Sequence, residues 1–288
     1  METPVKFQSD GLQLAGIVHV PDGLKKGEKR PGMIVLHGFG GNKDRPGSIN
    51  QAEMFCNWGY VTLRFDMRGL GESEGTPRRV ICMEQVADTK NALTWLAEHE
   101  HVDGERVGLS GTSFGAAVAV YTGGVDERVA AVISSGGWGD GARKFRGQHP
   151  TPEAWAKFTN MLAEGKRHRQ GTGESLMVPR WDIVPIPEHL RKHQPTGAAD
   201  EFPAETAQSM YDFKADDVVG NIAPRPLLLF HPSDDSVTPA SETAELFKRA
   251  GRPTDCHFLA KVDHFVFSES DARVTHMIDD WLEKYFPV

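Results

Sequence analysis

Short apolar runs alternate with segments of helical periodicity along most of the chain. Strands are predicted at 33–36, 60–65, 107–109, 129–133, 226–230 and 257–260. Helices are predicted at 49–58, 83–98, 240–249 and 272–286, and a buried helix begins at 116–120. Continuous apolar strands are typical of a sheet covered on both faces. Because strands that alternate with helices connect by right-handed crossovers, we expect an α/β fold: a mainly parallel twisted sheet with helices on both faces.

The N-terminal segment has a different pattern, with residues 5–9 and 12–20 on either side of Asp10-Gly11. An Asp-Gly pair between two strand-like runs predicts a tight hairpin. This hairpin would add an antiparallel edge to the sheet.

Residues 139–220 interrupt the alternation, since they contain many prolines and no clear strand. A structureless segment of this length is improbable inside a compact domain, so we expect an insertion of short helices. Its best helix lies at 152–164, with Pro152 in the first turn. The insertion is rich in basic residues, which indicates either a solvated helix surface or a lid that favours acidic substrates. These residues are Arg143, Lys144, Arg146, Lys166, Arg167, Arg169, Arg191 and Lys192.

Composition narrows the functional class. A length of 288 residues fits one α/β domain with one insertion, and a net charge of −8 argues against a nucleic-acid surface. Cys56, Cys82 and Cys256 are far apart, show no metal-ligand spacing and favour a reducing compartment, so we expect a cytoplasmic protein. The first residues contain no apolar signal segment, and no run has the ~20 apolar residues of a membrane span. We expect a small-molecule substrate, with no nucleic-acid or membrane partner; a homodimer stays open.

The stretch Gly111-Thr112-Ser113-Phe114-Gly115 fits G-x-S-x-G between a predicted strand and a predicted helix. A turn this tight leaves no space for side chains two residues before and after the serine, and it presents the hydroxyl at the end of the sheet. The helix that follows directs its first amides toward an anion formed there. Ser113 is therefore the candidate nucleophile; the alternative is a glycine-rich turn with an incidental serine.

Polar residues follow three other predicted strands, and in a parallel sheet these strand ends meet at one edge. A serine nucleophile needs a base with a pKa near neutrality, and that base needs a carboxylate to orient it. His264 follows the last strand and is the predicted base. Asp234 and Asp235 follow the strand before it, and spacing alone does not choose between them. The chain order Ser, Asp, His is the order expected for a G-x-S-x-G hydrolase.

An oxyanion formed at Ser113 needs two backbone donors. We expect the amides of Phe114, directly after the serine, and of Phe39, in the glycine-rich loop at 37–41 after the first parallel strand. His37 is expected to be a structural hydrogen-bonding residue of that loop. His231 is expected to be packed at a strand end, and Asp263 to point away from the site.

The loop at 66–75 is the remaining candidate. Asp66 and Arg68 are expected to form an ion pair that fixes this loop beside the site. The loop lacks the Lys-Ser/Thr ending of a phosphate-binding loop, and no metal-ligand spacing occurs. We therefore expect neither a cofactor nor a metal.

Five segments together make the chain resemble the α/β-hydrolase superfamily over nearly its whole length. They are His37-Gly38-Phe39-Gly40, the loop Phe65-Asp66-Met67-Arg68-Gly69-Leu70-Gly71-Glu72-Ser73, Gly111-Thr112-Ser113-Phe114-Gly115, Asp235-Ser236-Val237-Thr238-Pro239 and Asp263-His264-Phe265. The second of these is similar to the corresponding loop of dienelactone-hydrolase-like and single-domain prolyl-oligopeptidase-like esterases. The resemblance implies Asp235 as the acid, because in those relatives it lies four residues before a proline. It also implies a hydrolase core at 1–138 and 221–288 and an inserted helical cap at 139–220. Dienelactone hydrolase itself uses a cysteine nucleophile where this chain has Ser113.

The predicted function is a serine hydrolase that cleaves a carboxylic ester, thioester or lactone through an acyl-enzyme. Ser113, Asp235 and His264 are the predicted catalytic residues. Cleavage of a carbon–carbon bond beside a ketone, or of an aminoacyl peptide, is the alternative within enzymes. A non-catalytic binding module on the same fold is the alternative of another class.

Overall fold

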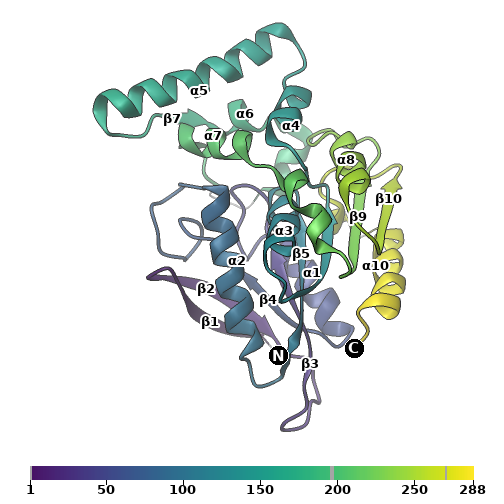
Figure 1. The fold of residues 1–288 in the computed structure, drawn as a ribbon. Helices are drawn as coiled ribbons and strands as arrows, with labels where there is room; N and C mark the ends of the chain where they lie inside the picture. Colours follow the sequence, from purple (N-terminus) through teal and green to yellow (C-terminus); the bar gives the residue numbers. More distant parts are fainter. Residues whose placement is uncertain (1, 195–197, 270) are drawn as a thin grey trace.

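The computed structural model describes residues 2–194, 198–269 and 271–288. Its main feature is an eight-stranded sheet of order β1-β2-β4-β3-β5-β6-β9-β10 (Figure 1). The strands are β1 (Glu2–Ser9), β2 (Leu12–His19), β3 (Arg30–Leu36), β4 (Val61–Phe65), β5 (Val102–Thr112), β6 (Val129–Ser135), β9 (Leu227–Pro232) and β10 (Thr254–Leu259). From β4 to β10 all neighbouring strands are parallel, and the β1–β2 hairpin pairs antiparallel with β4. The mainly parallel sheet with an antiparallel edge is confirmed.

Helices cover both faces of this sheet, as predicted. One face packs against α1 (Pro46–Asn57), α9 (Val266–Glu269) and α10 (Ala272–Tyr285). The other packs against α2 (Cys82–Ala97), α3 (Phe114–Val125) and α8 (Ser241–Arg249). The helix α9, one turn long, is not predicted by the periodicity.

The central strand β3 shows why its residues form a buried strand. Met33 and Val35 pack into the cluster under α1 and α10, whereas Ile34 and Leu36 pack into the cluster under α2 and α3. All four side chains are buried. Because successive side chains of a strand point to opposite faces, a run without polar positions is stable only between two layers of helices.

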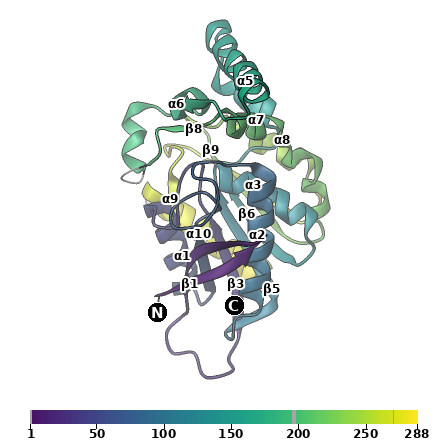
Figure 2. The ribbon, with the colours of Figure 1, turned by 90° about the vertical axis from the view of Figure 1, so that its left-hand side faces the viewer.

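Most residues between β6 and β9 form a separate layer above the sheet (Figures 1 and 2). The layer contains α4 (Gly141–Gln148), α5 (Pro152–Thr172), β7 (Met177–Pro179), α6 (Arg180–Ile183), η1 (Glu188–His193), β8 (Glu201–Pro203) and α7 (Ala204–Asp212). After it, η2 (Ala215–Asp217) and η3 (Val219–Ile222) pack beside α3 and return the chain to the sheet. Helix α5 begins at Pro152 as predicted, where the side chain of Thr151 accepts a hydrogen bond from the Ala154 amide, but it continues beyond Glu164 to Thr172. The antiparallel pair β7–β8 corrects the expectation of a strand-free segment; each strand has three residues, too few to produce a visible alternation.

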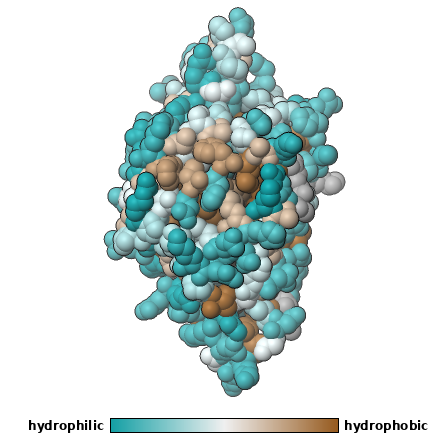
Figure 3. Space-filling view, turned by 90° about the vertical axis from the view of Figure 1, so that its right-hand side faces the viewer, coloured by the Kyte–Doolittle hydropathy of each residue, from teal (hydrophilic) through white to brown (hydrophobic). Residues whose placement is uncertain are grey.

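The face that carries β10 is shown in Figure 3, where apolar side chains gather in its middle. Phe258 of this edge strand is 47% exposed. Among the described residues, no helix combines the length and the apolar character required to span a bilayer.

Candidate active site

Ser113 lies at a sharp turn between β5 and α3. Its φ of 53° and ψ of −115° are a strained conformation for a residue with a side chain. A Cβ at Gly111 would collide with the carbonyl of Gly115, and a Cβ at Gly115 would collide with the carbonyl of Leu36. The Ser113 amide donates to the Ser135 carbonyl of β6 at 2.8 Å. The two glycines are therefore required by close packing, and the serine is held at the end of the sheet.

The loops after β9 and β10 bring an imidazole and a carboxylate together. His264 Nδ1 lies 2.8 Å from Asp235 Oδ2 and 3.1 Å from its Oδ1. The Asp235 side chain is fully buried, and its Oδ1 accepts hydrogen bonds from the Val237 and Thr238 amides, each at 2.8 Å. Asp234 is exposed, and its carboxylate contacts the Ser233 hydroxyl at 3.4 Å. Of the two aspartates, the structure thus places Asp235 against His264.

A second histidine also contacts the Asp235 carboxylate. His231 Nε2 lies 3.1 Å from Asp235 Oδ2, and the His231 ring is fully buried. Burial would raise the pKa of the Asp235 carboxyl, but the charge of His264 and hydrogen bonds from His231 and His264 hold that pKa well below its usual range. Asp235 is therefore ionised at neutral pH. The expectation of a packed His231 is confirmed. Its contact with Asp235 was not predicted from the sequence.

Asp263 joins the two loops rather than entering the site, as expected. Its Oδ1 accepts from the Ser236 amide at 2.9 Å and from the His264 amide at 2.7 Å. The Ser236 hydroxyl adds a hydrogen bond to Asp263 Oδ2 at 2.8 Å. These bonds fix the backbone of His264 relative to the loop that carries Asp235.

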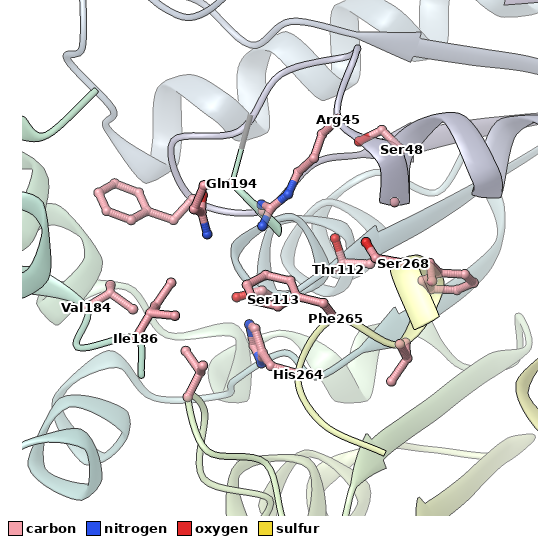
Figure 4. Close-up of a pocket in the computed structure, with 16 residues that line it drawn as sticks. Arg45, Ser48, Thr112, Ser113, Val184, Ile186, Gln194, His264, Phe265 and Ser268 are labelled. Atoms are coloured by element: carbon pink, nitrogen blue, oxygen red, sulfur yellow. The ribbon is translucent and has the colours of Figure 1, made fainter. Parts of the chain in front are cut away.

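Ser113 and His264 line one small cavity of about 40 Å³ (Figure 4). Their side chains face each other in this view. Among the described residues, no hydrogen bond joins the Ser113 hydroxyl to His264. Catalytic hydrogen bonds are often long before substrate binds, so this geometry is compatible with proton transfer between the two groups.

The glycine-rich loop after β3 borders the same cavity. A Cβ added at Gly38 would lie 3.5 Å from the Cβ of Ser113, so the loop backbone passes directly beside the serine. The Phe39 ring packs against Phe202 at 4.5 Å and Phe114 at 6.4 Å between centroids. Because α3 begins at Phe114, the amide of this residue belongs to the first helical turn, where amides have no intrahelical acceptor.

His37 fixes the start of this loop. Its Nδ1 lies 3.0 Å from the Gly38 carbonyl, and its Nε2 accepts from the Met67 amide at 3.3 Å. Burial lowers the pKa of His37, which favours the neutral ring that this pair of bonds requires. The expectation of a structural histidine is confirmed.

The expected ion pair between Asp66 and Arg68 is wrong. Asp66 accepts from the Lys43 amide at 2.6 Å and from Lys43 Nζ at 3.1 Å. Arg68 pairs instead with Asp88 at 2.6 Å and Asp10 at 2.8 Å. Asp66 and Arg68 are two residues apart in the sequence, but their side chains contact different parts of the molecule. Both ion-pair sets still fix the loop at 66–75.

Two of the basic residues of the inserted layer, Arg143 and Arg169, are neutralised by carboxylates. Arg143 pairs with Asp216 at 2.8 Å and with Glu242 at 2.7 Å, and Arg169 pairs with Glu205. These contacts favour a structural surface over a charged lid for these positions.

Two buried arginines at the site were not predicted from the sequence. Arg45, directly before α1, lines the cavity together with Ser113. Arg180 of α6 donates from Nη2 to the Phe39 carbonyl at 2.8 Å and to Gln194 Oε1 at 2.6 Å. Neither residue belongs to a motif or to a periodic pattern, so no sequence signal separates them from surface arginines.

The inserted layer closes the cavity from above through Val184, Ile186 and Gln194. Ile186 and Val237 also line a larger groove of about 600 Å³ on the other side. Among the residues that the structure describes, no group of three or more His, Cys, Asp or Glu side chains could hold a metal ion.

The fold agrees with the comparisons. The model of the serine aminopeptidase S33 family matches residues 27–271. The chain therefore belongs to this family of α/β-hydrolases, and it is a hydrolase.

Several relatives are similar along nearly their whole length. An uncharacterized 31.7 kDa protein in the traX-finO intergenic region of Escherichia coli is 27% identical, over 96% of this chain and 97% of that protein. The acyltransferase drtE of Aspergillus calidoustus is 25% identical, over 99% and 96%. The crystal structure of the α/β hydrolase GrgF from Penicillium sp. sh18 superposes with a TM-score of 0.82 over 99% of both chains, at 22% identity, which shows the shared fold.

Proposed function

We propose that this hydrolase cleaves a carboxylic ester, thioester or lactone through an acyl-enzyme on Ser113. The observation that carries the proposal is the common cavity: the strained Ser113 and His264 both line it, and the buried Asp235 lies behind His264 at 2.8 Å from its Nδ1. Each of the three residues follows a parallel strand, which is the edge where α/β enzymes bind their ligands.

In the first half of the reaction, the Ser113 hydroxyl attacks the carbonyl carbon while His264 Nε2 takes its proton. The ionised Asp235 keeps the proton of His264 on Nδ1, 2.8 Å away, so that Nε2 is free to act as base. The bond to the leaving alcohol or thiol then breaks, and His264 returns the proton to it. The acyl group remains on the Ser113 oxygen.

In the second half, water loses a proton to His264 and attacks the acyl-enzyme. The carboxylic acid departs, and the Ser113 oxygen regains the proton. A different acceptor in place of water would turn hydrolysis into acyl transfer, which is the activity named for the relative drtE.

The negative charge on the carbonyl oxygen would be held by the amides of Phe39 and Phe114. Phe114 directly follows Ser113 at the turn between β5 and α3, and the backbone at Gly38, one residue before Phe39, passes beside the serine. Loss of one such donor typically costs about 3 kcal/mol of transition-state stabilisation. Arg180 supports this donor loop, because it holds the carbonyl of Phe39.

We further propose that residues 139–220 act as a cap on a hydrolase core of residues 1–138 and 221–288. Val184, Ile186 and Gln194 of this segment line the cavity. The cap would then restrict the size of the acyl or alcohol group.

A fluorophosphonate probe tests the proposal directly. We expect stoichiometric labelling of Ser113, and a burst of 4-nitrophenol equal to the enzyme concentration with 4-nitrophenyl acetate. Ser113→Ala should lose both, whereas the control Ser268→Ala, a serine that lines the same cavity, should keep both. Unchanged turnover in Ser113→Ala would refute the mechanism, and failure of the wild type to label would favour a binding module.

A further inference from the structure

Arg45 is a buried arginine beside the nucleophile that uses only part of its hydrogen-bonding capacity. Its side chain is almost inaccessible, with 6% of the residue exposed. Nε donates to the His193 carbonyl at 3.1 Å, and the guanidinium lies over the Phe265 ring at 4.7 Å. Nη2 is buried and has no hydrogen-bond partner among the described residues. An unpartnered donor of this kind is costly unless a ligand satisfies it.

The charge of Arg45 is also uncompensated. Within the described part of the chain, no carboxylate lies within ion-pair distance of it, since the adjacent Asp44 pairs with Lys43 and Arg64. The neighbouring charge is Arg180, which is also buried and bonded to neutral oxygens. Burial and the Arg180 charge lower the pKa of Arg45 to about 9. The guanidinium therefore remains cationic at pH 7, in a region with an excess of positive charge.

The position of this charge ties it to the reacting atoms. A Cβ added at Gly38 would lie 3.4 Å from Arg45 Nη1 and 3.5 Å from the Ser113 Cβ, so only one glycine separates the two side chains. Figure 4 shows the guanidinium directed from the loop toward Gln194 and the space in front of Ser113. Arg45, Ser113 and His264 all line the same cavity of about 40 Å³.

We propose that Arg45 binds a carboxylate of the substrate, so that the enzyme prefers esters or thioesters that carry a free carboxylate a few bonds from the scissile carbonyl. A planar carboxylate matches the two donors of one guanidinium. A phosphate would need more donors than this small cavity offers, because Arg180 does not line it and directs its Nη2 to Phe39 and Gln194. The inference rests on the hydrolase function proposed for Ser113.

The test compares charged and neutral substrates of equal length. Monoethyl succinate, glutarate and adipate carry the carboxylate on the acyl half, and butanoyloxyacetic acid carries it on the alcohol half. Ethyl butanoate, pentanoate and hexanoate, and methyl butanoyloxyacetate, are their neutral counterparts. We expect the wild type to favour the charged member in one of the two arms by at least tenfold in kcat/KM.

Substitution of Arg45 should remove this preference by lowering kcat/KM far more for the charged ester than for the neutral ester. Arg45→Gln should lower kcat/KM for the charged ester by roughly 100-fold, the size of effect seen when one partner of a buried charge pair is lost. Arg45→Lys should retain part of the preference. Arg167→Gln, an exposed arginine of α5, removes the same charge and should change neither substrate. A purely structural role for Arg45 would instead lower both rates together.

A measurement on the wild type keeps the inference testable if the Arg45 variants do not fold. Adipate should inhibit neutral-ester hydrolysis competitively, and adipamide should not. The carboxylate site would be overturned by equal kcat/KM for charged and neutral esters in both arms, together with no inhibition by adipate. Neutral-ester turnover in that case would leave the Ser113 mechanism intact. Absence of any ester turnover together with absence of Ser113 labelling would overturn both.

Discussion

His231 Nε2 lies 3.1 Å from Asp235 Oδ2, so the carboxylate that orients His264 is itself held by a second ring. His231 Nε2 also faces the Thr238 carbonyl at 3.0 Å, and Nδ1 lies 2.7 Å from the Thr243 hydroxyl. Because two oxygen acceptors face Nε2, this nitrogen carries a proton, and His231 donates to the Asp235 carboxylate.

The first prediction concerns this donor. His231→Phe should lower kcat by about tenfold and the free energy of unfolding by roughly 1–3 kcal/mol, since it leaves a buried carboxylate with an unmet acceptor. His231→Gln keeps an N–H donor, so it should lose less kcat and less free energy of unfolding than His231→Phe. Steady-state kinetics and urea unfolding of the two variants measure the difference. Equal losses in His231→Phe and His231→Gln would mean that ring packing, and not the hydrogen bond, is what matters.

The second prediction separates the two adjacent aspartates. Asp235→Asn should lower kcat on the order of 10³–10⁴-fold, because the amide favours the wrong tautomer of His264. Asp234→Asn removes the same charge from an exposed position and should stay within about twofold of the wild type. Both are measured as kcat at saturating ester. A large loss in Asp234→Asn with little change in Asp235→Asn would reverse the assignment.

The third prediction concerns Lys144, a buried residue of α4 in the inserted layer. Its Nζ has no hydrogen-bond partner among the described residues and lies over the rings of Phe145 at 3.7 Å and Trp138 at 4.6 Å. Burial lowers the pKa of Lys144 from 10.5 to about 7. Between these values the unfolded chain binds more protons at this side chain than the folded protein does. Its contribution to stability therefore rises with pH through this window, by at most about 1.4 kcal/mol per pH unit.

Lys144→Met should remove that dependence. We expect the variant to be more stable than the wild type at pH 7, and the difference between the two to shrink by pH 9.5. Urea unfolding of both proteins at pH 7 and pH 9.5 measures this difference in the free energy of unfolding. Lys166→Met, at an exposed position of α5, is the control and should leave the pH dependence unchanged. A constant difference between wild type and Lys144→Met at the two pH values would show that Lys144 does not titrate in this range.

Much of the fold followed from local pattern. Apolar runs such as 33–36 predict buried strands, because no other environment accepts four consecutive apolar side chains in an extended chain. Ser113 and His264 were found by the rule that loops after parallel strands share one edge. Asp235 was preferred to Asp234 only through the resemblance to known esterases, and the structure places it against His264.

What the sequence did not indicate depends on side-chain direction in three dimensions. Arg45 and Arg180 come from distant segments and meet beside the site only after the inserted layer has packed on the core. Asp66 and Arg68 are close in sequence but turn to different partners, Lys43 and Asp88. The bond from His231 to Asp235 likewise requires the loop between them to fold back on itself. None of these contacts has a periodicity or a spacing that could reveal it.

The partition between the small cavity and the neighbouring groove consists in part of two aliphatic side chains, Ile186 and Val237, which touch both spaces. They come from different layers of the molecule, and neither takes part in the proposed proton transfers. A smaller side chain at either position would join the cavity and the groove without disturbing the reacting groups. Acceptance of longer acids or alcohols could therefore diverge among related chains by single exchanges at this wall, while the chemistry is inherited unaltered.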